Sequence, residues 1–169
     1  MSKTVLKTKI FGIQKFKSER NGGRGPYFYR MVTSNSVVIL PLLDDGTVVL
    51  ERQYRPAINK YIYEIPAGLI EKGESPAHAA VRELEEETGY LAGSMQLLFA
   101  GYPSPGTKTE FSTCYLATKL AKTKTNMDPD EVIDVKKVRL EELVRMIKRN
   151  QIVDVKTIAA VLFYVKFSA

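Results

Sequence analysis

Residues 68–90 read GLIEKGESPAHAAVRELEEETGY, and the rest of the chain is organised around this stretch. Ser75 can accept a backbone N–H as the N-cap of a helix, and Pro76 fits the first helical position because its missing donor is no loss there. Gly89 suits the C-terminal end of the same helix. The stretch therefore predicts a loop that begins at Gly68, followed by one short helix.

The helical spacing separates an apolar face from an acidic flank. On a wheel of about 100° per residue, Glu83 and Glu87 lie about 40° apart and Glu86 follows within roughly a quarter turn. Glu85 points to the opposite flank, so three of the four carboxylates converge. The apolar stripe that we expect to pack on the core is Ala77, Ala80, Val81 and Leu84.

Converging carboxylates repel one another, so a positive charge is expected between them. Hard oxygen ligands on one rigid element suit Mg²⁺ or Mn²⁺, and Mg²⁺ is usually held by one or two carboxylates together with phosphate oxygens of a substrate. The alternative is an acidic helix face that is simply solvated, which an ELEEE run alone would favour. The residues around the run decide between the two.

The spacing across the stretch is more specific than its acidity. Its fixed positions are Gly68, Glu74, Arg82-Glu83-Leu84, Glu86-Glu87, Gly89 and a large side chain at Tyr90. This pattern resembles the Nudix box of hydrolases that act on nucleoside diphosphates linked to another group. It departs only at its last place, which usually holds an aliphatic residue.

The resemblance assigns roles to individual residues. It implies that Glu74 and Arg82 orient the acidic cluster and that Glu86 belongs to the catalytic set. The metal ligands that it implies are Glu83, Glu86, Glu87 and the backbone carbonyl of Ala67.

Length and composition favour one globular domain. The chain has 169 residues, of which 44% are hydrophobic and 26% are charged, enough for a real core. No apolar run approaches the roughly 18 residues of a membrane span. The N-terminal MSKTVLKTKIFG lacks the apolar segment and cleavage site of a secretory signal, so we expect a cytoplasmic protein without membrane contact.

The single cysteine and the single histidine offer little chemistry. Cys114 lies in an expected strand, FSTCYLA, where a buried small hydrophobe is favoured over a nucleophile. His78 falls on the helix away from the three glutamates and is expected at the surface. Catalysis by histidine and zinc chemistry therefore have no basis in this sequence.

The net charge of +6 leaves nucleic-acid binding open, and residues 3–30 carry eight Lys or Arg against Glu19 alone. The favoured interpretation is ordinary surface charge that keeps the protein in solution, so we do not expect nucleic acid to be a partner. A third use fits the acidic cluster better, because a positive surround attracts a polyphosphate ligand.

Several segments alternate or cluster apolar residues as strands do. Residues 4–17 show an imperfect strand pattern, and residues 18–26 are rich in turn-forming residues. Residues 37–40 are apolar on both faces, which predicts a strand in the centre of the sheet. Two strands are expected to form a hairpin through Asp44-Asp45-Gly46. The remaining expected strands are 27–32, 36–43, 47–54, 61–65 (ended by Pro66 and Gly68), 95–102, 111–119 and 132–140.

Two helices are expected near the end, at 140–149 and 154–167. Asp154 can cap the second helix. Its apolar stripe is expected to be Val155, Ile158, Ala159, Leu162 and Val165.

The RQYRP run at 52–56 and the EIPAG run at 64–68 narrow the resemblance to the ADP-ribose pyrophosphatase group. By this resemblance Arg55 contacts the phosphates of the substrate, for which a bidentate guanidinium is suited; a plain surface arginine is the alternative. The loop PSPGTKTE places Pro105 sixteen residues after Gly89, close to a characteristic proline of the group. The loop, with Pro105 and Gly106, is thereby expected to line the nucleotide or sugar pocket.

The acidic segment NMDPDEVID at 126–134 matches the loop in which this group often places a catalytic glutamate. Glu131 is the best-placed match, with Asp130 and Asp128 as substitutes. Pro129 departs from the pattern, because an acidic residue is common there. Solvated turn carboxylates are the alternative.

Together these observations predict an α+β protein with the Nudix fold, a mixed β-sheet sandwiched by helices. Residues 1–34 are expected to be a β-rich extension and 35–169 the hydrolase domain. In the ADP-ribose pyrophosphatase group such an extension packs on a second subunit, so a homodimer is expected. Phe28 and Tyr29 are candidates to stack on a base, with core packing as the alternative.

The resemblance implies metal-dependent hydrolysis of the pyrophosphate bond in a nucleoside diphosphate sugar. ADP-ribose is the favoured substrate, giving AMP and ribose 5-phosphate, with Glu131 taking a proton from the attacking water. Another nucleotide conjugate, such as a GDP-sugar or a dinucleoside polyphosphate, is one alternative. A non-catalytic nucleotide- or RNA-binding module is the other, and an intact box speaks against it.

Overall fold

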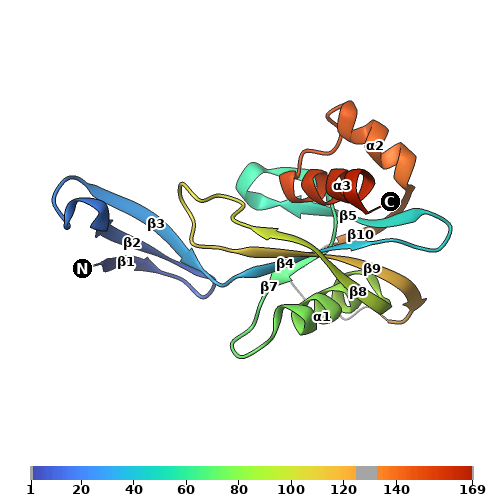
Figure 1. Cartoon of the computed structure of the whole chain (residues 1–169), viewed down its shortest axis with the longest axis horizontal. Helices are drawn as coiled ribbons and strands as arrows, with labels where there is room; N and C mark the ends of the chain where they lie inside the picture. Colours follow the sequence, from blue (N-terminus) through green and yellow to red (C-terminus); the bar gives the residue numbers. More distant parts are fainter. Residues whose placement is uncertain (1, 125–132, 169) are drawn as a thin grey trace.

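The structure is a computed structural model, and it describes residues 2–124 and 133–168 (Figure 1). No helix in these ranges is long and apolar enough to cross a membrane. Short 3₁₀ turns cover Glu19–Asn21 and Pro56–Ile58. The strands are β1 (Lys3–Lys7), β2 (Phe11–Lys17), β3 (Tyr27–Thr33), β4 (Ser36–Pro41), β5 (Thr47–Arg55), β6 (Lys60–Glu64), β7 (Ala67–Leu69), β8 (Tyr90–Gly101), β9 (Ser112–Lys122) and β10 (Ile133–Arg139). The α-helices are α1 (Pro76–Thr88), α2 (Leu140–Lys148) and α3 (Val155–Phe167).

Two sheets form the middle layer of the main body, with α1 on one side and α2 and α3 on the other (Figure 1). The strand orders are β7-β4-β9-β8 and β10-β5-β6, and β4 pairs with β9 in parallel. Alternate residues of β4 enter two cores: Val37 and Ile39 pack with α1, and Val38 and Leu40 pack with α2 and α3. The prediction of a central strand buried on both faces is confirmed, as is the α+β class.

The predicted hairpin between residues 36–43 and 47–54 is wrong. The turn itself forms, because Gly46 donates its N–H to the carbonyl of Leu43 and Leu43 donates to Thr47. Beyond one bridge between Leu42 and Val48, however, the strands part and join different sheets. Strand β4 takes β7 and β9 as neighbours, and β5 takes β6 and β10, which satisfies both edges of each buried strand.

Three segments have different bounds from those expected. Residues 4–17 hold two antiparallel strands rather than one, because the Thr8 hydroxyl bonds Phe11 and closes a turn. Gly68 lies within β7 instead of ending a strand, since β7 adds to the edge of β4. Strand β8 starts at Tyr90 rather than Met95, because it runs along the whole of β9.

The first three strands form a sheet of their own that projects from the main body (Figure 1). Its surface keeps large apolar side chains exposed, among them Leu6, Phe28 and Tyr29. The division into an extension and a hydrolase domain at residue 34 stays a prediction.

The buried faces of α1 and α3 differ from the predicted stripes. On α1, Ala80 and Leu84 are buried as expected, but Ala77 is exposed and Val81 only partly buried. Ala79 takes the place of Ala77, so the packing face is turned toward the carboxylate flank. On α3 the predicted stripe lies largely outside: Val155, Ala159, Leu162 and Val165 are exposed, and Thr157, Ala160 and Val161 are buried.

Candidate active site

Helix α1 begins and ends where its sequence predicts. The Ser75 hydroxyl accepts the backbone N–H of His78 at 3.3 Å, and Gly89 adopts a left-handed conformation with φ of 69°. Its N–H donates to the carbonyl of Glu85, which closes the last turn. Both caps fix the length of the helix and hence the position of its acidic side chains.

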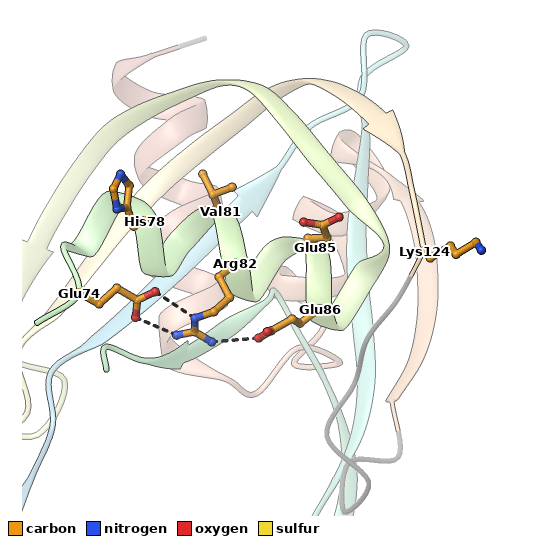
Figure 2. A pocket seen from close by; sticks show the side chains of 7 residues that line it. All are labelled: Glu74, His78, Val81, Arg82, Glu85, Glu86 and Lys124. Carbon is orange, nitrogen blue, oxygen red and sulfur yellow. Dashed lines mark hydrogen bonds and ion pairs between the residues drawn. The ribbon is translucent and has the colours of Figure 1, made fainter. Parts of the chain in front are cut away.

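Arg82 is the cation that the acidic flank requires (Figure 2). Its Nε and Nη2 donate to the two carboxylate oxygens of Glu74, both at 3.0 Å, and Nη2 also reaches the carbonyl of Leu69 at 3.1 Å. Its Nη1 donates to Glu83 at 2.8 Å and to Glu86 at 2.9 Å. The five N–H donors of the Arg82 guanidinium are therefore matched by five acceptor oxygens. The bonds to Glu74, above all, raise the pKa of Arg82, and Arg82 in turn lowers the pKa of Glu74.

The third predicted metal ligand, Glu87, is turned toward strand β7. It is 4% exposed, and its carboxylate accepts the backbone N–H of Ala67 at 3.0 Å. The three glutamates therefore do not share one partner: Glu83 and Glu86 accept hydrogen bonds from Arg82, whereas Glu87 accepts one from Ala67. Among residues 2–124 and 133–168, no three acidic, His or Cys side chains are grouped as a metal site.

Gly68 is required by the close approach of Glu83. A Cβ built on Gly68 would overlap the carboxylate of Glu83, although the backbone conformation of Gly68 itself is one that any residue adopts. The absent side chain creates a cradle in which an acidic group lies against the β7 backbone. Carboxylate oxygens from α1 beside backbone of β7 are the hard donors that suit a divalent cation of the Mg²⁺ type, so these residues fit the expected metal.

Arg55, the predicted phosphate contact, is held by a residue that the sequence analysis did not single out. Its Nε and Nη2 donate to the two oxygens of Glu64 at 2.7 and 2.8 Å. The Glu64 side chain is 3% exposed, whereas that of Arg55 is 39% exposed. The pair is bidentate, and it raises the pKa of Arg55, with smaller contributions from Glu87 and Asp154.

A hollow of about 340 Å³ joins Arg55 to the β7 cradle. Lys108 and Lys156 also line it, and each has an acidic neighbour, Glu110 at 3.4 Å and Asp154 at 3.6 Å. The wall is completed by the N-terminal sheet and the first strands of the body, through Ile10, Phe11, Met31, Thr33, Ser36, Ala67, Gly68 and Leu69. Cationic side chains thus lie beside the acidic flank, an arrangement suited to a ligand with phosphate groups and a metal.

The predicted loop reaches the hollow through Lys108 rather than through its proline and glycine. Pro105 and Gly106 are exposed and are not among the lining residues of the hollow, although Lys108 of the same loop is. The loop is attached to the N-terminal sheet, because Met31 donates to the carbonyl of Thr107 at 2.8 Å. Phe28 is 47% exposed on the outer part of β3, where it packs on Phe16, and it does not line the hollow.

The predicted general base, Glu131, and its substitutes Asp130 and Asp128 lie outside the described residues. Sequence reasoning missed Glu64, Lys108 and Lys156. Glu64 is the first residue of the EIPAG run, so the same run that narrowed the family could have identified it. The two lysines gave no local signal, since they come to line one hollow only in the folded chain, one from loop 103–108 and the other from α3.

The side chains set aside by the sequence analysis do not line the hollow beside Arg55. Cys114 is buried, and burial raises the pKa of its thiol to about 12, as expected for a structural cysteine rather than a nucleophile. Glu85 accepts a hydrogen bond from Thr123 on the opposite flank of α1. A second hollow, on the outer side of α1, is lined by Glu85 and the exposed His78 together with Glu74, Val81, Arg82, Glu86 and Lys124 (Figure 2).

Comparison with known proteins identifies the family. The model of the NUDIX domain matches residues 33–161, so the chain belongs to the Nudix family, as its box predicted. The fold agrees: a crystal structure described as an ADP compounds hydrolase superposes with a TM-score of 0.86, at 23% identity, over 99% of this chain and 91% of that one.

Two curated relatives extend the match beyond the box. The ADP-ribose pyrophosphatase of Bacillus subtilis is 34% identical over 166 residues, which is 94% of this chain and 90% of the relative. The methanol dehydrogenase activator of Bacillus methanolicus is 40% identical over 128 residues, or 75% of this chain and 69% of the relative.

Proposed function

We propose that this protein hydrolyses the pyrophosphate bond of a nucleoside diphosphate sugar, with ADP-ribose as the preferred substrate and AMP and ribose 5-phosphate as products. The observation that carries the proposal is the acidic flank of α1, organised by Arg82, beside a hollow lined by Arg55. The similarity to a named ADP-ribose pyrophosphatase over almost the whole chain supports the substrate class.

Glu83, Glu86, Glu87 and the carbonyl of Ala67 would hold the divalent metal, Mg²⁺ or Mn²⁺. When bound, such a metal neutralises phosphate charge and lowers the pKa of a coordinated water. The buried position of Glu87 and the cradle at Gly68 support these ligands, because both place carboxylate oxygens against the β7 backbone.

The protein's own groups supply the rest of the mechanism. Arg55 binds the diphosphate through donors that Glu64 leaves free, and Lys108 and Lys156 add positive charge along the hollow. Arg82 and Glu74 keep the acidic flank in place, and Glu131 accepts the proton of the attacking water. Pro105 and Gly106 shape the rim that receives the sugar or base.

A homodimer in the cytoplasm is part of this proposal. The exposed apolar surface of the N-terminal sheet supports a second subunit, since Leu6, Phe28 and Tyr29 are each about half exposed in the single chain. In the dimer Phe28 would contact the partner or a base. Light scattering coupled to size exclusion tests this directly: a mass of one chain at micromolar concentration contradicts it.

A panel of nucleotide sugars, assayed with Mg²⁺ and a phosphatase coupled to the products, tests the reaction and the substrate together. We expect ADP-ribose to give the highest kcat/KM. A GDP-sugar or dinucleoside polyphosphate that exceeds it would support the alternative within the enzyme class. Absence of turnover across the panel, together with salt-sensitive tight RNA binding on filters, would favour the non-catalytic module.

A further inference from the structure

Glu64 is a buried charged residue that has no part in the reaction described so far. It lies at the end of β6, opposite Glu51 of β5, and both residues are 2% exposed. Burying a carboxylate is costly unless it is paired and hydrogen-bonded. The partner of Glu64 is Arg55, nine residues earlier in the chain, through two hydrogen bonds.

The geometry of this pair leaves part of the Arg55 guanidinium available. A guanidinium carries five N–H donors in a planar fork. Glu64 takes one on Nε and one on Nη2, along the side edge of the group. The remaining three are the two donors of Nη1 and one of Nη2. One donor of Nη1 and the remaining donor of Nη2 form the end-on pair that binds two phosphate oxygens in parallel. Arg55 lines the hollow and is 39% exposed, so a ligand there can reach these donors.

The carboxylate of Glu64 also decides which acidic group Arg55 approaches. Glu87 and Asp154 are near enough to act on the charge of Arg55, and Glu64 has the largest effect of the three. Glu87 is a proposed metal ligand, and Asp154 caps α3 by accepting the N–H of Thr157.

We infer that Glu64 is a positioning residue, which turns the end-on donors of Arg55 into the hollow to bind the diphosphate. The inference rests on the proposed function and deepens it. Glu64 does not touch the ligand. It acts through Arg55, and its charge and its reach are both needed, because a carboxylate meets Nε and Nη2 with two charged oxygens, whereas a neutral amide offers a single oxygen to both donors, as Gln14 does to Arg30.

The test compares Glu64→Gln, Arg55→Gln and the double variant with the wild type. Glutamine keeps the volume of Glu64 but offers one acceptor and no charge. We expect Glu64→Gln to raise the KM for ADP-ribose about tenfold, with kcat changed less, and to weaken binding of the α,β-methylene analogue of ADP-ribose equally in calorimetry. In the Arg55→Gln background, the same change should alter kcat/KM less than twofold, since the group being positioned is gone.

Glu142→Gln is the matched control, because Glu142 also pairs with an arginine, Arg145, at 2.6 Å, but on the exposed face of α2. Its KM should equal that of the wild type. Melting temperatures of all variants separate loss of fold from loss of position. Should Glu64→Gln not fold, Glu64→Asp keeps the charge with a shorter reach, and its KM should still rise severalfold.

Two results would overturn the inference. One is a folded Glu64→Gln variant whose KM and affinity for the analogue are within twofold of the wild type; Glu64→Asp takes its place if Glu64→Gln does not fold. That result would mean that the pair of Arg55 and Glu64 has only a structural role. The other is full additivity of the two substitutions in the double variant. The proposed function fails on a different measurement, namely the absence of turnover by the wild type across the panel of nucleotide sugars.

Discussion

Two arginines flank the site, and they differ in how completely their donors are used. Arg82 meets acceptors from Glu74, Glu83, Glu86 and the carbonyl of Leu69, so its guanidinium is saturated by the protein. Arg55 gives two donors to Glu64, and its other three have no partner among the described residues. A saturated guanidinium organises its neighbours, whereas a half-used one that borders a hollow is available to a ligand.

The comparison assigns Arg82 to the metal side of the site and Arg55 to the ligand side. Substitutions on the metal side should therefore lower kcat, because they disturb the group that stabilises charge in the transition state. Substitutions on the ligand side should mainly raise KM. The variants below test this division, and a variant that changes the wrong kinetic parameter would break it.

The largest effect is expected for Glu87→Gln. The amide oxygen of glutamine can still accept the N–H of Ala67, so the fold should persist, but the charge offered to the metal is lost. We expect turnover with Mg²⁺ to fall by on the order of 10³, the scale at which loss of transition-state charge stabilisation acts. Steady-state kinetics measures the turnover, and circular dichroism measures whether the fold persists. An unimpaired, folded variant would end the assignment of Glu87 as a ligand.

The second-largest effect is expected for Gly68→Ala. The added methyl would overlap the carboxylate of Glu83, and the end of a flexible side chain is the part that yields. Stability should change little, while a displacement of about 1 Å at Glu83 is expected to cost roughly 10²-fold in kcat. Gly101→Ala is a suitable control, because a Cβ at Gly101 meets nothing within 4 Å. Equal kcat values for the two variants would contradict the cradle.

Arg82→Lys tests the saturated arginine. An ammonium group is a point charge with three donors and cannot meet both oxygens of Glu74 together with Glu83 and Glu86. Since groups that orient metal ligands typically affect activity by about 10- to 100-fold, we expect a fall in kcat of that size. The midpoint of thermal unfolding should fall as well. A rise in KM at constant kcat would place Arg82 on the ligand side instead.

Arg55→Lys tests the half-used arginine. Lysine keeps the charge near Glu64 but loses the end-on pair of donors, so binding of the diphosphate should weaken by one charge-assisted hydrogen bond, about tenfold in KM. The kcat value should stay within about threefold. Initial rates over a range of ADP-ribose concentrations separate the two parameters, and a loss confined to kcat would show that Arg55 acts on the acidic flank.

Sequence reasoning succeeded where the signal was local. Ser75 and Gly89 cap α1 as expected, because capping depends on residues within one turn. The spacing of the glutamates likewise placed Glu83 and Glu86 on one flank, where both reach Arg82.

It failed where pairing is decided over long distances. The turn at residues 44–46 looked like a hairpin, but its strands found better partners far along the chain in β9 and β10. Helix α3 is apolar on several sides, so periodicity could not tell that Ala160 and Val161, rather than Leu162 and Val165, face the core. Glu64 belongs to the EIPAG run, but its pairing with Arg55 arises only when β5 and β6 pair.

The smallest expected effect concerns the pH dependence of stability in Glu74→Gln. Hydrogen bonds from Arg82 hold the pKa of Glu74 below its ordinary value of 4.5. A carboxylate whose pKa is lowered by folding contributes stability above its unfolded pKa, and that contribution disappears as the pH falls through the folded pKa. The wild type should therefore melt a few degrees above Glu74→Gln at pH 7.

Below the ordinary glutamate pKa the two melting curves should approach each other, because a protonated Glu74 has the same charge as the glutamine. Calorimetric scans from pH 7 down to pH 3 measure the difference, with Glu142→Gln as the exposed control. This experiment probes the saturated arginine alone, since Glu74 contacts Arg82 and not Arg55. If the difference in melting temperature grew toward low pH, the position of Arg82 would not depend on the charge of Glu74. The two arginines would then differ in exposure rather than in how many of their donors are used.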